Sequence, residues 1–219
     1  TLQGTVEPRP AVYRVEIEVD GAPGQPPVPW LVTNPIYLGR PGDDDSRVPP
    51  RESVSRMKPP ALPLARNIAE WTVEHSAGSD AAVDAMVAVG GGRQVLFRYA
   101  LSGPMSAGPY AALVVPVPAG LGEHDRVTFA VHADRPMRVS VQLRAPGDGN
   151  GERWHRSVYV GTEARDISVL LADVRPRGTT STAQPPLDHV RSLLFVVDTV
   201  NAKSGTNGRV WIERLRAEN

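Results

Sequence analysis

The sequence of 219 residues contains no cysteine. Disulfide bonds, thiolate catalysis, and zinc or iron–sulfur sites held by cysteine are therefore excluded. Positive and negative side chains balance at 24 each, so the chain lacks the basic excess that nucleic-acid-binding domains usually carry. The longest apolar runs, at 111–115 and 192–197, fall far short of the roughly 18 residues that a membrane helix needs. We therefore expect neither nucleic acid as a partner nor membrane insertion.

Glycine and proline are abundant instead, with 20 and 22 residues, which is about a fifth of the chain. That share is high for a globular domain but lies below the roughly 25–30% that is typical of disordered sequences. It fits many short elements joined by turns. The length suits one domain with appendages, and it is sufficient for a buried core.

From residue 67 onward, apolar and polar residues alternate. Because successive side chains of a strand point to opposite faces, this two-residue period predicts strands. Turn-forming residues separate them at a spacing of roughly 8–12 residues, which indicates a β-sandwich or barrel. The predicted strands cover residues 68–75, 81–89, 94–101, 109–117, 125–133, 136–145, 153–160, 166–173, 191–199 and 208–215. A short helix is the alternative for residues 81–89, because Val83, Met86 and Val87 also fit one helical face.

The same alternation predicts which side chains fill the interior. The predicted core residues are Val127, Phe129, Val131, Met137, Val139, Val141, Leu143, Ile167, Val169 and Leu171. Each such side chain contributes about 1.5–3 kcal/mol when it is fully buried. A core of this kind is expected to support the fold without disulfides.

The first 66 residues have a different pattern. Residues 12–20 alternate as a half-buried strand, and the apolar run 30–38 is interrupted by Pro35, which cannot donate to a sheet ladder. Residues 40–66 hold six prolines without an apolar period, which predicts an extended spacer. The predicted organisation is a β segment at 1–39, a proline-rich linker at 40–66 and an all-β sandwich at 67–219.

A recognisable order of elements runs through the second half of the chain. It consists of a strand, a short proline turn and a strand (126–144), a tryptophan-led strand (153–160), an apolar strand (166–176) and a closing hairpin (192–216). The stretch from Trp71 to Leu215 resembles the jelly-roll sandwiches of carbohydrate-binding modules and of the wider galactose-binding-like superfamily. The resemblance implies a jelly-roll β-sandwich that binds a glycan or docks to a neighbouring catalytic domain. It also implies a structural calcium ion between the first and last strands, for which Glu74 and Glu213 are the matching acids.

Residues 13–38 resemble a different family. They are similar to the closing segment of metallohydrolase domains of the polymerase-and-histidinol-phosphatase (PHP) type, in which a Trp-led stretch ends in Ser/Thr-Asn-Pro-Ile-Tyr. Here Trp30 leads, and residues 33–37 read Thr-Asn-Pro-Ile-Tyr. The metal ligands of that family lie upstream of this segment, so none is carried over. The resemblance predicts the carboxyl-terminal part of a larger metallohydrolase-like protein, and an extracellular or periplasmic location is favoured.

An aromatic and basic face is the best candidate for a binding site. Residues 136–145 and 153–160 are expected to form a hairpin, in which one register presents His155 and Tyr159 and the other presents Trp154. Aromatic rings stack on the C–H face of a sugar, while planar Arg and Gln side chains bond pairs of hydroxyls. The predicted ligand-binding residues are Arg138, Gln142, Arg144, Trp154, His155 and Tyr159. A structural explanation stays open, because an outward sandwich face is polar in any case and Trp154 would then cap the core.

Asp198 and Asn201 form a polar loop after a very apolar strand. Their oxygens suit a calcium ion, but the same residue types also form Asx turns that cap a strand end. The candidate metal ligands are therefore Glu74, Asp198, Asn201 and Glu213, with both alternatives open.

No catalytic residue is predicted. The glycine run at 90–92 lacks the lysine and the helix of a phosphate loop, and no Gly-x-Ser-x-Gly elbow occurs. Carboxylates that would have to converge for glycosidic cleavage are Glu70, Glu74, Asp84, Glu152 and Asp173. We therefore predict a non-catalytic, carbohydrate-binding type of module. The alternatives are a purely structural accessory domain that stabilises its parent enzyme and a stand-alone hydrolase.

Overall fold

The computed structural model describes most of the carboxyl-terminal part of the chain and four short segments before it. The described ranges are 11–13, 16–17, 31–32, 36–38, 60–64, 68–88, 91–147, 151–180 and 182–219. By contacts, the chain divides into two compact units, Thr1–Arg56 and Met57–Asn219.

The first unit contains two short antiparallel pairs. Strand β1 (Ala11–Tyr13) pairs with β4 (Ile36–Leu38), and β2 (Glu16–Ile17) pairs with β3 (Leu31–Val32). Residues 30 and 33–35 of the PHP-like motif lie outside the described residues. That resemblance therefore stays a prediction.

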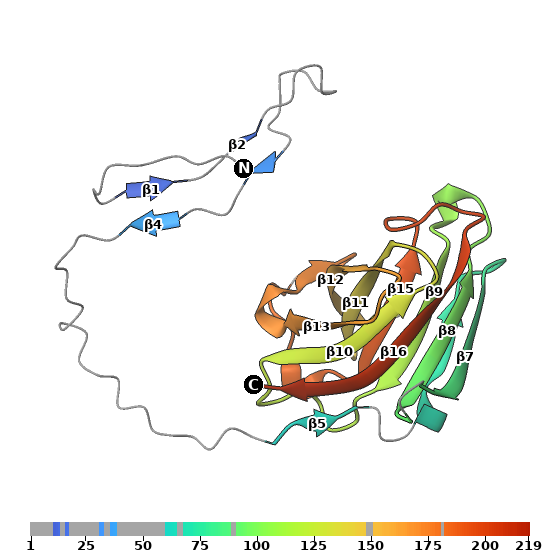
Figure 1. Ribbon diagram of the computed structural model, residues 1–219, viewed down its shortest axis with the longest axis horizontal. Helices are drawn as coiled ribbons and strands as arrows, with labels where there is room; N and C mark the ends of the chain where they lie inside the picture. The colour runs from blue at the N-terminus through green and yellow to red at the C-terminus, as the bar shows by residue number, and fades with distance from the viewer. Residues whose placement is uncertain are drawn as a thin grey trace. The chain divides into compact units, whose positions relative to one another are not determined.

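The second unit consists of two antiparallel sheets packed face to face (Figure 1). The first sheet, which we call the β16 sheet, has the strand order β13-β10-β16-β8-β7, with β5 also paired to β16. Its strands are β5 (Leu62–Pro63), β7 (Asp80–Val87), β8 (Arg93–Ala100), β10 (Arg126–Ala133), β13 (Arg165–Leu170) and β16 (Asn207–Glu218). In Figure 1, β16 runs in dark red between β10 and β8.

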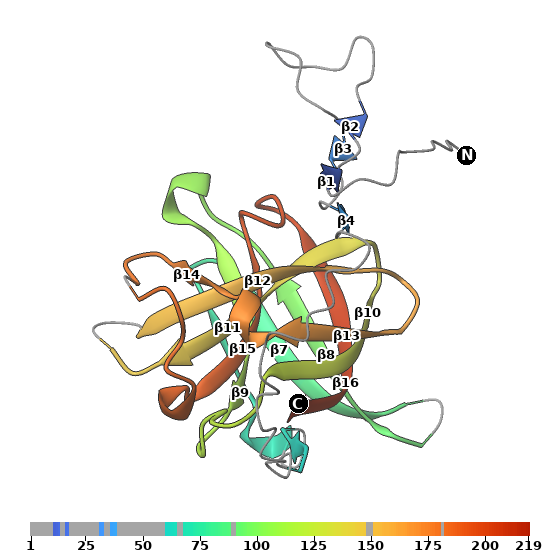
Figure 2. The same ribbon diagram turned by 90° about the vertical axis from the view of Figure 1, so that its left-hand side faces the viewer.

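The second sheet, which we call the β11 sheet, has the order β14-β12-β11-β15-β9-β6. Figure 2 shows β14, β12 and β11 side by side. Its strands are β6 (Thr72–His75), β9 (Tyr110–Pro116), β11 (Met137–Ala145), β12 (Glu152–Val160), β14 (Arg175–Arg177) and β15 (Ser192–Asp198). The two sheets together confirm the predicted all-β jelly-roll sandwich.

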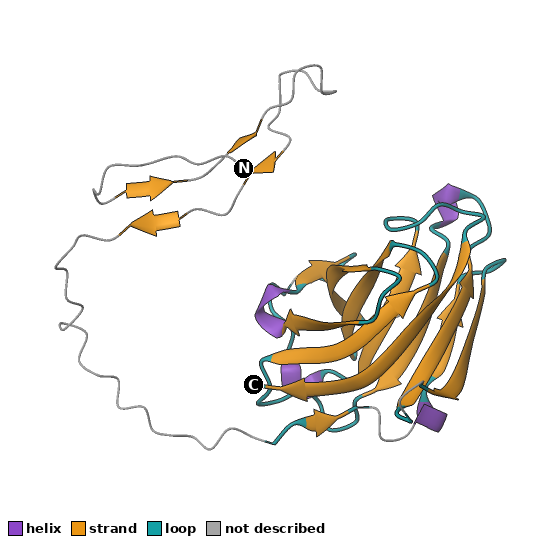
Figure 3. Ribbon diagram, viewed as in Figure 1, coloured by secondary structure: helices purple, strands orange, loops and turns teal. Residues whose placement is uncertain are grey.

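Helical structure in the described ranges is confined to short turns of 3-10 helix at the connections (Figure 3). They are η1 (Ile68–Glu70), η2 (Met105–Ala107), η3 (Leu171–Asp173) and η4 (Leu187–His189). The helical alternative for 81–89 is wrong, because β7 pairs with β8 from Asp80 to Val87. Within the described ranges, no helix combines the length and apolar character that crossing a lipid bilayer requires.

The core lies between the two sheets and follows the predicted alternation. Val139, Val141 and Leu143 are buried on the inner face of β11, and they pack in one cluster with Val127 and Phe129 of the facing sheet. Phe129 meets Phe195 of β15 edge to face, with ring centroids 5.0 Å apart. Such aromatic pairs add about 0.5–1.5 kcal/mol beyond the burial of their area. Met137 and Ile167 are partly buried against the same cluster.

A β-bulge interrupts the alternation in β16. Its register with β10 shifts between Thr128 and Ala130, and Arg214 has a φ of 51° at this point. An extra residue in one strand reverses which alternate residues face inward. Ile212 and Leu215 therefore both reach the core, although they are three residues apart.

Two strands lie where none is predicted. Strand β5 falls inside the range 40–66 that is predicted as linker, and it pairs with Arg216 and Ala217 of β16, so the end of that range belongs to the sandwich. Strand β14 pairs with β12 at the edge of its sheet. Both contain a proline, which lacks the N–H for a ladder and is tolerated only at such edges.

The prediction that Trp154 binds ligand is wrong. Its side chain has no exposed surface, and its indole Nε1 donates to the Thr182 carbonyl at 2.9 Å. The reason is register: Trp154 pairs with Leu143, which points into the core, so both side chains face inward. Trp154 caps the core, as the structural alternative holds.

The substitution Trp154→Ala is therefore a stability variant. It removes a large buried ring and leaves a cavity, so we expect it to lower the free energy of unfolding by about 3–5 kcal/mol. Urea denaturation measures this change. Trp211→Ala is the matched control, because Trp211 is half-buried on the outer face, stacked on His132 at 4.7 Å, and should cost much less. Equal losses in the two variants would contradict this account of Trp154.

Candidate functional site

The outer face of the β11 sheet carries the predicted polar residues. Because side chains alternate along a strand, burying Val139, Val141 and Leu143 turns the intervening residues of β11 outward. The β11–β12 hairpin brings together opposite pairs on this face. They are Arg138 with Tyr159, Ser140 with Ser157, Gln142 with His155, and Arg144 with Arg153. Five of the six predicted ligand-binding residues thus share one face, and the buried Trp154 is the exception.

An ion pair spans much of this face. The Arg144 guanidinium donates from Nη1 to both carboxylate oxygens of Glu74, at 2.8 and 2.9 Å. Arg144 lies on β11 and Glu74 on β6, with β15 and β9 between them. Three strand spacings amount to about 14 Å on a flat sheet, so the two side chains must extend over the intervening strands. The pair therefore covers part of the face rather than projecting into solvent.

A second ion pair crosses the other half of the sheet. Arg177 on β14 donates to a carboxylate oxygen of Asp198 on β15, at 2.5 Å. Strands β12 and β11 lie between them. The Asp198 side chain is only 5% exposed, so the pair is shielded from water on the carboxylate side. Shielding strengthens the attraction, but desolvation of the charges offsets much of that gain.

Below the Arg144–Glu74 pair lies a small apolar floor. Ala112, Val114, Leu194 and Val196 form a buried cluster of their own, separate from the core between the sheets, and Tyr110 packs against it. These residues come from β9 and β15, the strands that the Arg144–Glu74 pair crosses. Buried apolar side chains on an outer face are unexpected for a face that only meets water.

Gln142 is the most constrained polar group of the face. It has no exposed surface, and its Nε2 donates to the Ser140 hydroxyl at 3.2 Å. Its Oε1 has no hydrogen-bond partner. A buried acceptor without a donor costs about 1–3 kcal/mol. Such a group is retained at the expense of stability, which favours a functional role for it.

His155 lies beside Gln142 in the hairpin. Its Nδ1 is 3.4 Å from the Ser140 hydroxyl, and its ring is half-buried. Burial, followed by the positive charge of Arg177, lowers the pKa of His155, and Asp198 opposes part of this effect. The ring therefore favours the neutral form, which carries one donor and one acceptor nitrogen.

Arg138 and Tyr159 form the exposed margin of the face. Arg138 donates to the Ser157 hydroxyl at 2.9 Å and to the Ser157 carbonyl at 3.1 Å. Tyr159 is 47% exposed, and the guanidinium carbon of Arg165 lies 5.0 Å from its ring centroid. Both residues are available to a ligand at this side, although one face of the Tyr159 ring is already in contact with Arg165.

The four candidate metal ligands do not gather in one place, although Asn201 lies beside Asp198 and its Nδ2 donates to Asp198 Oδ1 at 3.4 Å. Glu74 binds Arg144 on the β11 sheet, whereas Glu213 accepts from the Gln94 amide at 2.6 Å on the β16 sheet. Asp198 Oδ1 accepts from the Val200 backbone at 3.0 Å, which is the Asx turn of the second alternative. In the described ranges, no group of three or more His, Asp or Glu side chains is placed to hold a metal. The structural calcium ion stays a prediction.

Two of the carboxylates considered for hydrolysis, Glu74 and Asp84, are engaged separately. Asp84 pairs with Arg98 on the outer side of the β16 sheet, at 2.6 Å, while Glu74 pairs with Arg144 on the other sheet. Two carboxylates facing one cleft are needed for glycosidic cleavage. Glu74 and Asp84 do not form such a pair.

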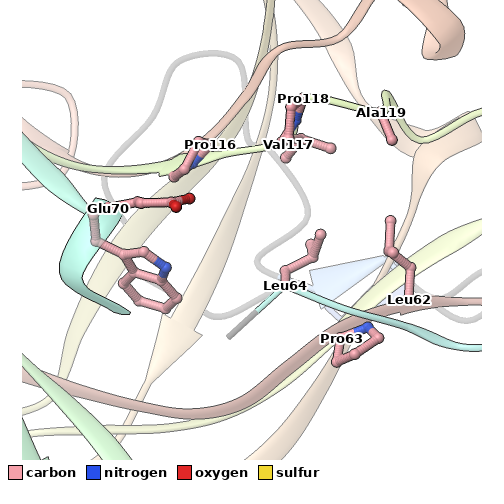
Figure 4. A pocket seen from close by; sticks show the side chains of 9 residues that line it. Leu62, Pro63, Leu64, Glu70, Pro116, Val117, Pro118 and Ala119 are labelled. Carbon is pink, nitrogen blue, oxygen red and sulfur yellow. The ribbon is translucent and has the colours of Figure 1, made fainter. Parts of the chain in front are cut away.

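A pocket beside β5 is a further candidate for a ligand site (Figure 4). Leu62 and Leu64 line it on one side, and Pro116 and Pro118 face them. Its charged lining residue is Glu70. A ligand site needs several convergent polar groups to fix orientation, and this pocket supplies few. The outer face of the β11 sheet is the stronger candidate.

Sequence reasoning misses two members of this face and assigns two others a different role. Arg153 alternates with His155 on the same strand, so the correct register would have included it. Arg177 lies on the short strand β14, whose proline hides it from a strand search. Glu74 and Asp198 are predicted only as metal ligands, although each is the partner of an arginine.

Comparison with known proteins supports the architecture. No protein-family model and no curated protein matches the chain. A solved family 11 carbohydrate-binding module from Clostridium thermocellum, in complex with a β-1,3-1,4-mixed-linked tetrasaccharide, is 14% identical with a TM-score of 0.58, covering 73% of this chain and 94% of the module. The family 11 module of a cellulosomal cellulase from the same organism is 15% identical with a TM-score of 0.57 over the same shares. At such identities the likeness establishes the fold.

The lowered pKa of His155 predicts a pH effect on stability. The pKa of His155 is lower in the folded state than its ordinary value of 6.5. The unfolded chain therefore binds more protons than the folded chain at acid pH. Stability from this group is therefore present above pH 6.5 and is lost as the pH falls below it. We expect His155→Gln to flatten the decrease in melting temperature between about pH 7.5 and 5, relative to the unsubstituted chain.

Thermal unfolding at both pH values checks this expectation, and the His155 ring resonances, followed by NMR, report its pKa directly. His75→Gln is the matched control, because His75 is exposed at the end of β6. An identical pH profile for His155→Gln and the unsubstituted chain would contradict it.

Proposed function

We propose that this chain is a non-catalytic module that binds a carbohydrate chain on the outer face of the β11 sheet. The observation that carries the proposal is Gln142, a buried amide whose Oε1 lacks a donor, set among fixed polar side chains. A sugar hydroxyl is a donor of the right size for such an acceptor. Because Gln142 has no exposed surface, the hydroxyl reaches Oε1 by displacing the side chains that cover it.

The composition of the face supports the same conclusion. Planar guanidinium and amide groups bond neighbouring hydroxyls in pairs, and Arg144 and Gln142 are held in place by their own partners. Tyr110 and Tyr159 supply aromatic rings, which pack against the C–H faces of sugars. Groups held in position before binding lose less conformational entropy when the ligand arrives.

The likeness to solved modules supports the proposal by analogy. One of those modules is described in complex with a tetrasaccharide. The same fold serves many functions, so the argument for this chain rests on its own residues.

Attachment to a larger metallohydrolase-like protein is a separate proposal, supported only by residues 13–38. It predicts histidine and aspartate metal ligands encoded upstream of Thr1. A reading frame without them would refute the attachment while leaving glycan binding untouched. A purely structural accessory role would show instead as a chain that binds no glycan and stabilises its parent.

Gln142→Met tests glycan binding. Methionine has a similar shape but no amide, so removal of the unpaired oxygen offsets loss of the hydrogen bond to Ser140, and the stability of the variant should stay close to that of the unsubstituted chain. It should bind oligosaccharide about tenfold more weakly, since loss of one or two hydrogen bonds costs about 1.4 kcal/mol. Calorimetric titration with a panel of neutral and charged oligosaccharides measures the affinity.

Arg209→Ala is the matched control for this titration. Arg209 is exposed on the outer side of the β16 sheet, so its removal should leave affinity unchanged. Absence of binding to every member of the panel, or equal affinity of Gln142→Met and the unsubstituted chain, would overturn the proposal.

A further inference from the structure

Three arginines lie in one row across the outer face of the β11 sheet. Arg144 is paired with Arg153, and Arg153 with Arg177, on three adjacent strands. Like charges directly opposite each other in a sheet are destabilising. A row of three is therefore retained against a cost in stability.

The face carries a surplus of positive charge, although the chain as a whole is neutral. In the described strands of the sheet, the outward arginines are Arg138, Arg144, Arg153, Arg175 and Arg177. The outward carboxylates there are Glu74 and Asp198. Five positive charges against two negative ones leave a local excess of three.

Arg153 is the arginine with the weakest compensation in the row. Its side chain is 18% exposed, and its ion pair within the described residues is a contact of 4.0 Å with Glu74, which already accepts two shorter bonds from Arg144. Burial, and next the charge of Arg144, lower the pKa of Arg153. Its charge is thus largely removed from water without a carboxylate of its own.

In the described strands, the outer face has few aromatic rings that could stack on a neutral sugar. Tryptophan offers the largest stacking surface, but Trp71 and Trp154 are buried in the core and Trp211 lies on the other sheet. Among the described residues, the aromatic rings of the outer face are therefore those of tyrosine and histidine. The outer face therefore offers more charged groups for binding an anion than aromatic rings for stacking on a sugar.

We propose that the glycan bound on this face is anionic, with a carboxylate or sulfate group accepted by Arg153 within the Arg144–Arg153–Arg177 row. This inference rests on the proposed carbohydrate binding. Guanidinium groups bind planar pairs of anionic oxygens through two parallel hydrogen bonds, and these charge-assisted bonds are about twice as strong as neutral ones. An anionic group would supply the counter-charge that Arg153 lacks, and a neighbouring hydroxyl would supply the donor for Gln142 Oε1.

The test compares sugars that differ only in charge. An oligosaccharide of 1,4-linked galacturonate is titrated against the full chain beside the same oligosaccharide after chemical reduction of its carboxyl groups. We expect the charged form to bind about tenfold more tightly or better, and added salt to reduce this preference by screening. The third arm uses an uncharged oligosaccharide to which sulfate groups have been added. It distinguishes sulfate from carboxylate as the source of the anionic oxygens.

Arg153→Gln is the decisive variant. It relieves repulsion within the row, so its melting temperature should not fall, and the preference for the charged form should shrink to about twofold or less. Arg209→Gln, on the other sheet, should keep the preference. Retained preference in Arg153→Gln would overturn the role of this residue.

The two proposals fail in different ways. Equal affinity for the charged and reduced oligosaccharides, with no gain for the sulfated one, would overturn the anionic ligand and leave carbohydrate binding in place. Absence of binding in all three arms and in the wider neutral panel would overturn both.

Discussion

Gln142 and His155 lie directly opposite one another in the β11–β12 ladder, and this pairing determines which side chains the sheet presents. A strand has only two faces, so one register places Gln142, Arg144, His155 and Arg153 together outside. The same register sends Trp154 inward against Leu143. A slip of one residue would exchange the two sets, exposing apolar side chains and burying charge. The hydrophobic core therefore enforces the composition of the candidate site.

Several features of the outer face of the β11 sheet reduce the stability of the fold. Its arginines stand opposite one another, its amide oxygen has no donor, and its ion pairs are partly withdrawn from water. The opposed arginines and the unpaired oxygen lower stability, and desolvation offsets much of what the ion pairs contribute. Sites where local stability is given up are commonly sites of function, because binding supplies the missing partner. The large core between the sheets makes such a site tolerable.

The fold alone leaves the ligand undecided. Family 11 modules share the architecture at 14–15% identity, which fixes the order of layers but no side chain. What distinguishes this chain is the Arg144–Arg153–Arg177 row, with a small apolar floor of alanine, valine and leucine on the neighbouring strands β15 and β9. Chemistry of this kind suits polar, oriented recognition more than flat aromatic stacking. The residues, rather than the fold, carry the functional argument.

The sequence by itself determined the fold class, nearly all the strands of the sandwich and most of its core, because two-residue alternation is a local signal. It also determined the outward positions of Arg138, Gln142 and Arg144, since outward positions on β11 follow from inward ones. Only the tertiary structure decided the inward position of Trp154, because both registers of β12 alternate equally well. The partners of Arg144 and Arg177 were likewise beyond the sequence, since Glu74 and Asp198 come from strands distant in the chain and meet them only when the sheet assembles.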